Sequence, residues 1–168
     1  MTEHERRAAA ETPEHIRCAL ITVSDTRTAA TDTSGQAMRA ILEQHGHAVV
    51  AQQIVRDEIA QITDAIRAAA AHCDVIITSG GTGITRRDST YEAVQQLLAK
   101  ELPGFGELFR MLSYHEIGAA AMLSRATAGV FGGSIVFCLP GSTNAVRLAL
   151  ERLIVPQMRH LVWELLRQ

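Results

Sequence analysis

The stretch Asp74-Val-Ile-Ile-Thr-Ser-Gly-Gly-Thr-Gly83 decides how the rest of the chain is interpreted. It begins with a short apolar run rich in β-branched residues, which is typical of a strand buried on both faces of a sheet. The run ends at Gly80, Gly81 and Gly83. Because glycine lets a ligand approach the main chain, this loop is a candidate phosphate-binding loop; the alternative is a tight turn between a strand and a helix.

The segments on either side of this stretch repeat a strand–helix pattern. Apolar runs predict strands at 17–23 and 48–55. Each is followed by residues with helical apolar spacing, the first helix capped by Thr33 or Ser34 and the second starting near Ile59. Three strand–helix units predict a mostly parallel sheet covered by helices on both faces, which is a three-layer α/β/α sandwich.

The C-terminal half adds further elements. We expect helices over 91–99 and 107–117, and then an antiparallel hairpin in which residues 124–131 and 134–139 flank a Gly-Gly turn. The final segments predict helices over 145–155 and from Pro156 onwards, because proline is favoured in a first helical turn.

The length and composition favour one folded domain. A chain of 168 residues with 47% hydrophobic residues is long enough for one full core. Residues 1–15 are polar and lack apolar periodicity, so we expect a flexible N-terminal arm followed by a single domain over 16–168.

Charge and apolar patterning exclude several classes of partner. The formal net charge of −2, with mixed signs throughout, argues against a nucleic-acid partner. No apolar run reaches 18 residues and the N-terminus is charged, which argues against a membrane span and a secretory signal. We therefore expect a cytoplasmic protein.

The cysteines, histidines and lysine of the chain argue against several kinds of site. Cys18, Cys73 and Cys138 lie in or beside apolar runs, which favours reduced core thiols over disulfides or a metal site. The histidines have no metal-ligand spacing, and Lys100 is the only lysine, so neither a Walker motif nor a Schiff base is indicated.

The predicted sheet brings four polar loops together. Ligands of such sheets bind beyond the carboxyl ends of the strands. That edge would carry Ser24-Asp25, Asp57, the glycine loop and Pro140-Gly141-Ser142. In the glycine loop, backbone N–H groups and the hydroxyls of Ser79 and Thr82 could donate to an anion.

Two acids and two arginines accompany the glycine loop. Asp57 and Asp88 could bind Mg²⁺ beside phosphates, or each could cap the helix that follows it. Arg86 and Arg87 could clamp a phosphate or remain solvated.

Several motifs together resemble the MoaB/MogA family of molybdenum-cofactor biosynthesis proteins. The resemblance runs in order from about Arg17 to the C-terminus, with details closer to the MoaB branch, and Tyr91 stands where the family often has proline. The motifs are Thr78-Ser-Gly-Gly-Thr-Gly83, Arg86-Arg-Asp88 with Thr90 and Glu92, Pro103-Gly-Phe-Gly-Glu107, Ser124-Arg125-Ala126 and Leu139-Pro-Gly-Ser142.

The resemblance implies a trimer or a dimer of trimers that binds molybdopterin. Active members use Mg-ATP to adenylylate molybdopterin with release of pyrophosphate, and a molybdate-insertion protein would receive the product. Asp57 and Asp88 match the acids assigned to Mg-ATP handling. The resemblance also implies a nucleotide-phosphate loop at Ser79, Gly80, Gly81, Thr82 and Gly83 and a ligand cleft lined by Ser24, Asp25, Glu107, Ser124, Arg125, Pro140, Gly141 and Ser142.

The alternative is a non-catalytic molybdopterin-binding or scaffold protein of the MoaB branch. Branch members without adenylylation often have the acid after the second strand altered, and this chain retains Asp57 there. An unrelated dinucleotide enzyme would need a Gly-x-Gly-x-x-Gly loop, which the chain lacks.

Overall fold

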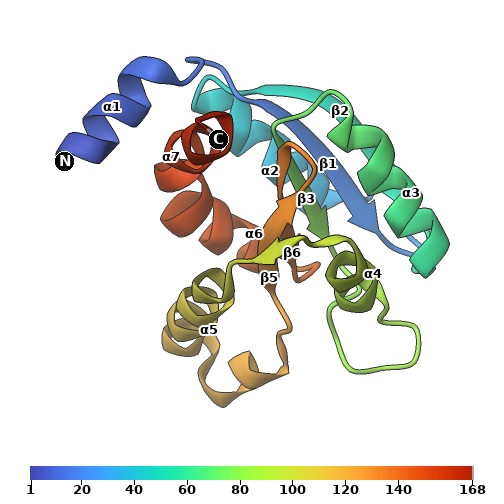
Figure 1. The fold of residues 1–168 in the computed structure, drawn as a ribbon. Helices are drawn as coiled ribbons and strands as arrows, with labels where there is room; N and C mark the ends of the chain where they lie inside the picture. The colour runs from blue at the N-terminus through green and yellow to red at the C-terminus, as the bar shows by residue number, and fades with distance from the viewer. Residues whose placement is uncertain (168) are drawn as a thin grey trace.

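The computed structural model describes residues 1–167 and shows a central sheet between two layers of helices (Figure 1). This confirms the predicted three-layer α/β/α sandwich. The elements in chain order are α1 (Glu3–Glu11), β1 (Arg17–Val23), α2 (Thr33–Gln44), β2 (Ala48–Val55), α3 (Ile59–Ala70), β3 (Val75–Ser79), α4 (Thr90–Leu97), β4 (Lys100–Glu101), α5 (Pro103–Ile117), the 3₁₀ segment η1 (Gly118–Leu123), β5 (Thr127–Phe131), β6 (Ser134–Leu139), α6 (Thr143–Ala149), the π-helical η2 (Leu150–Ile154) and α7 (Val155–Leu166).

The sheet has six strands in the order β2-β1-β3-β6-β5-β4. Strands β2, β1, β3 and β6 are parallel, while β5 pairs antiparallel with both β6 and β4. The predicted parallel strands and the antiparallel hairpin are therefore present. The two-residue strand β4 was not predicted, because so short a run carries no alternation of its own.

Side chains of the central strands alternate between two cores. On β1, Cys18 and Leu20 join the core beneath α2, α6 and α7, whereas Ala19 and Ile21 join the core beneath α3 and α4. Strand residues point alternately to opposite faces, so a strand buried on both sides needs apolar residues at every position. Cys18, Cys73 and Cys138 are free and buried, as the sequence predicted.

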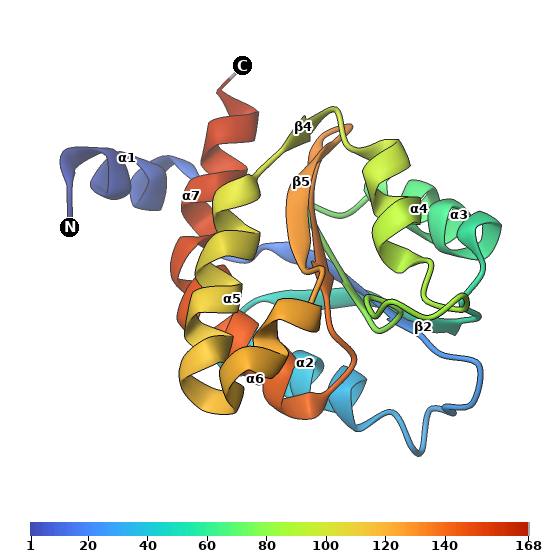
Figure 2. The same cartoon turned by 90° about the horizontal axis from the view of Figure 1, so that it is seen from below.

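The N-terminal segment differs from the expected loose arm. Glu3–Glu11 form α1, which is capped by Thr2 and lies beside α7 (Figure 2). Ala8 is buried there, and the Trp163 indole N–H donates to Glu11 over 2.7 Å. The prediction was wrong because the contacts that hold α1 come from α7, more than 140 residues further along the chain.

Local predictions at three helix ends also need correction. Asp32, rather than Thr33 or Ser34, caps α2, and it accepts from the Gly35 N–H over 3.0 Å. The last helices do not break at Pro156, because a π-helical segment joins α6 to α7. None of the helices in residues 1–167 is long and apolar enough to cross a membrane.

Candidate functional site

The loops that follow β1, β2, β3 and β6 meet at one edge of the sheet. The Ser24 N–H donates to the carbonyl of Val55 over 2.9 Å, and the Gly80 N–H donates to the carbonyl of Leu139 over 3.0 Å. Because these strands are parallel, their carboxyl ends point the same way. The edge predicted from the sequence therefore exists, and the loop between β3 and α4 extends from it (Figure 1).

Neighbouring atoms lie so close to the backbone at Gly80 and Gly81 that only glycine fits at these positions. Gly80 has φ +97°, and a Cβ there would lie 2.3 Å from the carbonyl oxygen of Val23. Gly81 has φ +67°, and a Cβ there would lie 2.2 Å from the hydroxyl of Thr90 and 2.7 Å from Oδ2 of Asp57. Both positions require glycine for conformation and for space. The loop closes where the Thr90 N–H donates to the carbonyl of Gly81 over 3.0 Å.

Asp57 lies at the end of β2 and is 9% exposed. Its Oδ1 accepts from both the backbone N–H and the hydroxyl of Ser89, over 2.9 and 2.6 Å. Its Oδ2 lies against Gly81 and accepts no hydrogen bond within residues 1–167. Asp57 does not cap its own helix, because Glu58 is the N-cap residue of α3. One carboxylate oxygen is thus held and the other faces the glycine loop.

Asp88 is held within the loop itself. Its Oδ2 accepts from the N–H and the hydroxyl of Thr85 over 2.9 and 2.6 Å, and a Cβ on Gly83 would lie 2.6 Å from the same oxygen. The bond from the Thr85 hydroxyl, aided by the N–H groups of Thr85 and Gly83, holds the pKa of Asp88 below its usual value despite partial burial. Asp88 does not cap α4, whose N-cap residue is Ser89.

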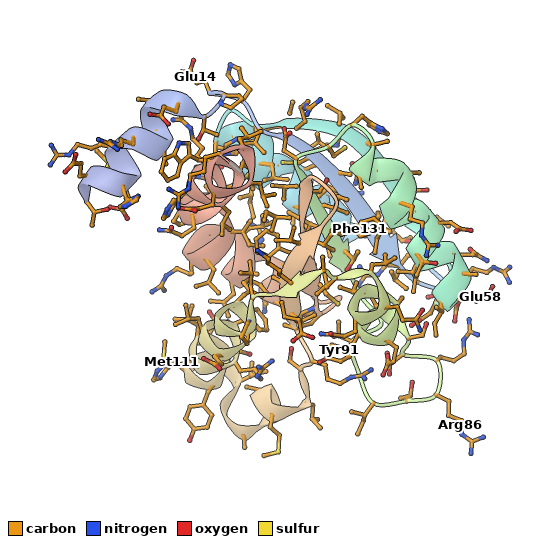
Figure 3. The ribbon with its side chains drawn as sticks, in the orientation of Figure 1. Glu14, Glu58, Arg86, Tyr91, Met111 and Phe131 are labelled. Carbon is orange, nitrogen blue, oxygen red and sulfur yellow. The ribbon has the colours of Figure 1, made fainter. Side chains whose placement is uncertain are left out.

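Asp25 joins the loop after β1 to the far side of the glycine loop. Its carboxylate forms a two-pronged ion pair with Arg87, with Nε–Oδ2 and Nη2–Oδ1 distances of 3.0 and 2.8 Å. It also accepts from the Asp57 N–H over 3.2 Å. The Arg87 bond, with the Asp57 N–H, holds the pKa of Asp25 below its usual value. Arg87 is therefore charge-paired, whereas Arg86 points outward and bonds to nothing within residues 1–167 (Figure 3).

Ser24 and Ser142 lie at the same edge, but their hydroxyls are used locally. Ser24 accepts from the N–H groups of Thr26 and Arg27 over 3.2 and 3.0 Å, which forms a serine turn. Ser142 caps α6 by accepting from the Ala145 N–H over 3.2 Å. Between Pro140 and Ser142, Gly141 packs against Gly80, since a Cβ on Gly141 would lie 3.1 Å from the Gly80 Cα.

Glu107, Ser124 and Arg125 belong to a neighbouring cavity of about 420 Å³. Tyr91 and Arg110 also line it, but Asp57 and Asp88 do not. The predicted site residues therefore divide into two groups, one at the strand edge and one between α4 and α5. Arg125 connects the groups because its guanidinium reaches the carbonyls of the glycine loop.

Sequence reasoning missed several residues that build the strand-edge site. Ser89 and Thr90 follow Asp88 directly, yet only the fold brings them against Asp57 and Gly81. The hydroxyls of Ser79 and Thr90 are buried without a hydrogen-bond partner in residues 1–167. Such hydroxyls are costly unless a bound molecule or water satisfies them.

A second missed group supports the loop after β1. Asp32 is 2% exposed and accepts from the Thr22 hydroxyl over 2.7 Å and from Arg27 over 3.4 Å. Arg27 also donates to the carbonyl of Gly141 over 3.2 Å, so it joins the loops after β1 and β6. The Asp-Thr-Ser-Gly sequence at 32–35 is a helix-start signal that could have identified Asp32.

The donor set at the edge fits a magnesium ion shared with phosphates. Residues 1–167 contain no cluster of three or more His, Cys, Asp or Glu suited to a metal. Mg²⁺ is usually bound through only one or two carboxylates, with phosphate oxygens and water completing its shell. The unbonded Oδ2 of Asp57 beside the glycine loop could supply one such carboxylate oxygen, and Asp88, just before α4, could supply another.

Comparisons with known proteins identify the family of this chain. Residues 19–160 match the family model described as a probable molybdopterin binding domain. The chain is 50% identical over 171 residues to molybdenum cofactor biosynthesis protein B of Bacillus anthracis, covering 100% of this chain and 99% of the relative. It is 52% identical to the protein of the same name from Bacillus subtilis, covering 92% of this chain and 93% of that one.

Solved structures give the same result. A crystal structure of molybdenum cofactor biosynthesis protein B has a TM-score of 0.90 at 51% identity, covering 94% of this chain and 100% of that one. The tungsten cofactor synthesizing protein MoaB from Pyrococcus furiosus has a TM-score of 0.82 at 40% identity, covering 90% and 98%. The chain therefore belongs to the MoaB/MogA family of molybdenum-cofactor biosynthesis proteins, whose shared unit is a probable molybdopterin binding domain.

Proposed function

We propose that this protein is a molybdopterin adenylyltransferase of molybdenum-cofactor biosynthesis. It would use Mg-ATP to transfer AMP onto the terminal phosphate of molybdopterin and release pyrophosphate. The observation that carries the proposal is the placement of Asp57: Ser89 holds Oδ1, while Oδ2 lies unbonded against Gly81 of the glycine loop.

The glycine loop would bind the phosphates of ATP. Gly80 and Gly81 have positive φ and no side chain, so a phosphate can approach their backbone closely. The unpartnered hydroxyls of Ser79 and Thr90 are further donors beside this backbone. Asp57 and Asp88 would hold Mg²⁺, which when bound offsets charge on the phosphates.

The transfer itself needs orientation more than acid–base chemistry. A terminal phosphate oxygen of molybdopterin bonds to the α-phosphorus of ATP, and the bond from that phosphorus to the bridging oxygen breaks. Pyrophosphate leaves with the electron pair of the broken bond. Because a phosphate monoester is already ionised near neutral pH, no general base is required, and positioning by the loops is the main contribution.

One observation favours a second candidate, molybdopterin binding without catalysis. Oδ2 of Asp88 already accepts two hydrogen bonds from Thr85. This acid therefore stabilises the loop whether or not it also binds a metal. Under this candidate the edge would bind the pterin phosphate and produce no adenylylated product.

A single assay separates the two candidates. The purified protein is incubated with Mg-ATP and molybdopterin, and adenylyl-molybdopterin and pyrophosphate are measured. We expect product from the wild type, and a loss of at least about 100-fold in Asp57→Asn, because the neutral amide keeps the shape but loses the charge that attracts a cation. Asp64→Asn, on the exposed face of α3, is the matched control. Tight molybdopterin binding by calorimetry without product would support the second candidate.

We also propose that the protein assembles with copies of itself, as a trimer or a dimer of trimers. Large apolar side chains 48–76% exposed gather on α5 and η1, namely Leu108, Met111, Tyr114, Ile117, Met122 and Leu123. Exposed apolar clusters of this kind mark protein interfaces. Met111 lies on the outer side of α5 (Figure 3). A cytoplasmic molybdate-insertion protein would be the partner that takes the adenylylated product.

A further inference from the structure

The guanidinium of Arg125 is bonded on several sides by protein atoms. Nε donates to the carbonyl of Thr82 over 3.1 Å, and Nη2 donates to the carbonyls of Gly83 and Asp88 over 2.5 and 3.3 Å. Nη1 forms an ion pair with Glu92. Arg125 thus connects Thr82 and Gly83 of the glycine loop to Asp88, near the start of α4.

Two groups in α4 hold Arg125 in turn. Glu92 supplies the opposite charge, and the Tyr91 ring lies beneath the guanidinium at 5.1 Å from its centroid. Tyr91 lies on the side of α4 that faces α5 (Figure 3). The charge of Arg125 is paired with Glu92, and most of its N–H donors are bonded to backbone carbonyls. Arg125 therefore has little capacity to bind a phosphate directly.

Two of the three peptide groups whose carbonyls accept from Arg125 also approach the two acids. In a trans peptide group the C=O and N–H point in opposite directions. The carbonyl of Asp88 accepts from Arg125, and the N–H of the same peptide group, on Ser89, donates to Asp57 over 2.9 Å. A single planar group therefore connects Arg125 to Asp57.

The same relation holds at the start of the loop. The carbonyl of Thr82 accepts from Arg125, so the Gly83 N–H of that peptide group points the other way, and this N–H helps to lower the pKa of the Asp88 carboxylate. A Cβ on Gly83 would lie 2.6 Å from Oδ2 of Asp88, which shows how closely this backbone approaches the acid. Of the three peptide groups whose carbonyls accept from Arg125, two therefore have an acid near their N–H side.

We propose that Arg125 is a positioning residue that orients Asp57 and Asp88 through the Asp88–Ser89 and Thr82–Gly83 peptide groups. This replaces the direct ligand contact expected from the sequence. Hydrogen bonds in such a chain polarise one another, so a charged donor at the carbonyl strengthens the donation of the N–H beyond it. The inference rests on the proposed function for the role of the two acids as metal ligands, while the backbone coupling itself does not depend on catalysis.

The test uses Arg125→Gln and Arg125→Lys in the full chain. Arg17→Gln is the matched control, since Arg17 forms a two-pronged ion pair with Asp74 at the opposite edge of the sheet. The first readout is amide hydrogen exchange of Gly83 and Ser89 in the protein without ligands. The second is the affinity for Mn²⁺ in the presence of ATP, measured by paramagnetic titration.

We expect Arg125→Gln to exchange both amides faster and to bind Mn²⁺ about tenfold more weakly, as is typical when a residue that orients metal ligands is removed. Arg125→Lys should shift both readouts in the same direction but by less, because lysine keeps the positive charge but lacks the several N–H donors of the planar guanidinium. Arg17→Gln should leave both readouts at the wild-type value.

Two results would overturn the proposal. One is loss of ATP binding in Arg125→Gln with unchanged exchange of Gly83 and Ser89, which would make Arg125 a direct phosphate ligand. The other is an equal change in Arg17→Gln, which would make the effect one of general stability. Both readouts can be obtained even if the wild type forms no adenylylated product, so failure of the proposed function is seen separately.

Discussion

The backbone N–H and the hydroxyl of Ser89 donate to the same oxygen of Asp57, over 2.9 and 2.6 Å. This contact joins the residue just before α4 to the end of β2. It turns the other carboxylate oxygen towards Gly81 of the glycine loop. The orientation of Asp57 therefore depends on a residue 32 positions away in the sequence.

Ser89→Ala should weaken this orientation while leaving the backbone bond in place. A hydroxyl bond to a charged group contributes about 2 kcal/mol, so we expect a loss of that size in the free energy of unfolding. Metal affinity should fall about tenfold, as for other residues that orient a ligand. Denaturant titration and Mn²⁺ titration measure the two effects. Ser89→Thr keeps the hydroxyl and should retain most of the wild-type stability and metal affinity. Wild-type stability and metal affinity in Ser89→Ala would refute the role of the hydroxyl.

Gly81→Ala should destabilise the protein strongly. The residue has φ +67°, and its Cβ would lie 2.2 Å from the Thr90 hydroxyl. Backbone strain alone costs about 1–3 kcal/mol, which corresponds to a Tm lowered by about 5 °C in a domain of this size. Gly133→Ala is the control, because a Cβ there meets nothing within 4 Å. Equal Tm values for the two variants would show that Gly81 is not constrained as the structure indicates.

The Asp25–Arg87 ion pair should make the stability of the loop depend on pH. The Arg87 bond lowers the pKa of Asp25 in the folded protein. A group whose pKa is lowered on folding stabilises the fold above its unfolded pKa, about 3.9, and this contribution is lost as pH falls through the lowered value.

Comparison with Asp25→Asn measures that contribution. The difference in Tm between wild type and Asp25→Asn should be constant from about pH 7 to about pH 5 and should shrink below about pH 4. A difference that grows on acidification would contradict the lowered pKa. Added salt should reduce the difference, since Asp25 and Arg87 are both exposed.

Met111→Glu should disrupt self-association. Met111 is 51% exposed within the apolar surface of α5 and η1, and a buried unpaired carboxylate at an interface is costly. Light scattering after size-exclusion chromatography should show a lower mass than the wild type at equal concentration. Leu166→Glu, at the exposed end of α7, is the control and should keep the wild-type mass. A wild-type mass for Met111→Glu would show that this surface is not the interface.

Most of the fold could be predicted from local patterns. The apolar runs at β1, β3 and β6 are buried at every position or nearly so, which requires helices on both faces. α1 and β4 could not be predicted this way. The first is held by α7, and the second has only two residues.

For the site, the sequence predicted which loops meet at the edge and which residue types they carry. It did so because parallel strands place their carboxyl ends together and because strand ends are marked by glycine and polar residues. These patterns predict the three glycines, Asp57 and Asp88 at that edge.

The contacts that those residues make depend on the tertiary packing of the chain. Whether Asp57 caps a helix or accepts from Ser89, and whether Arg125 faces a ligand or the carbonyls of Thr82 and Gly83, depends on contacts between segments more than 30 residues apart. Side-chain hydrogen bonds form over about 3 Å, so their partners depend on how the strands, loops and helices pack. Local sequence patterns do not specify that packing closely enough to predict individual hydrogen-bond partners.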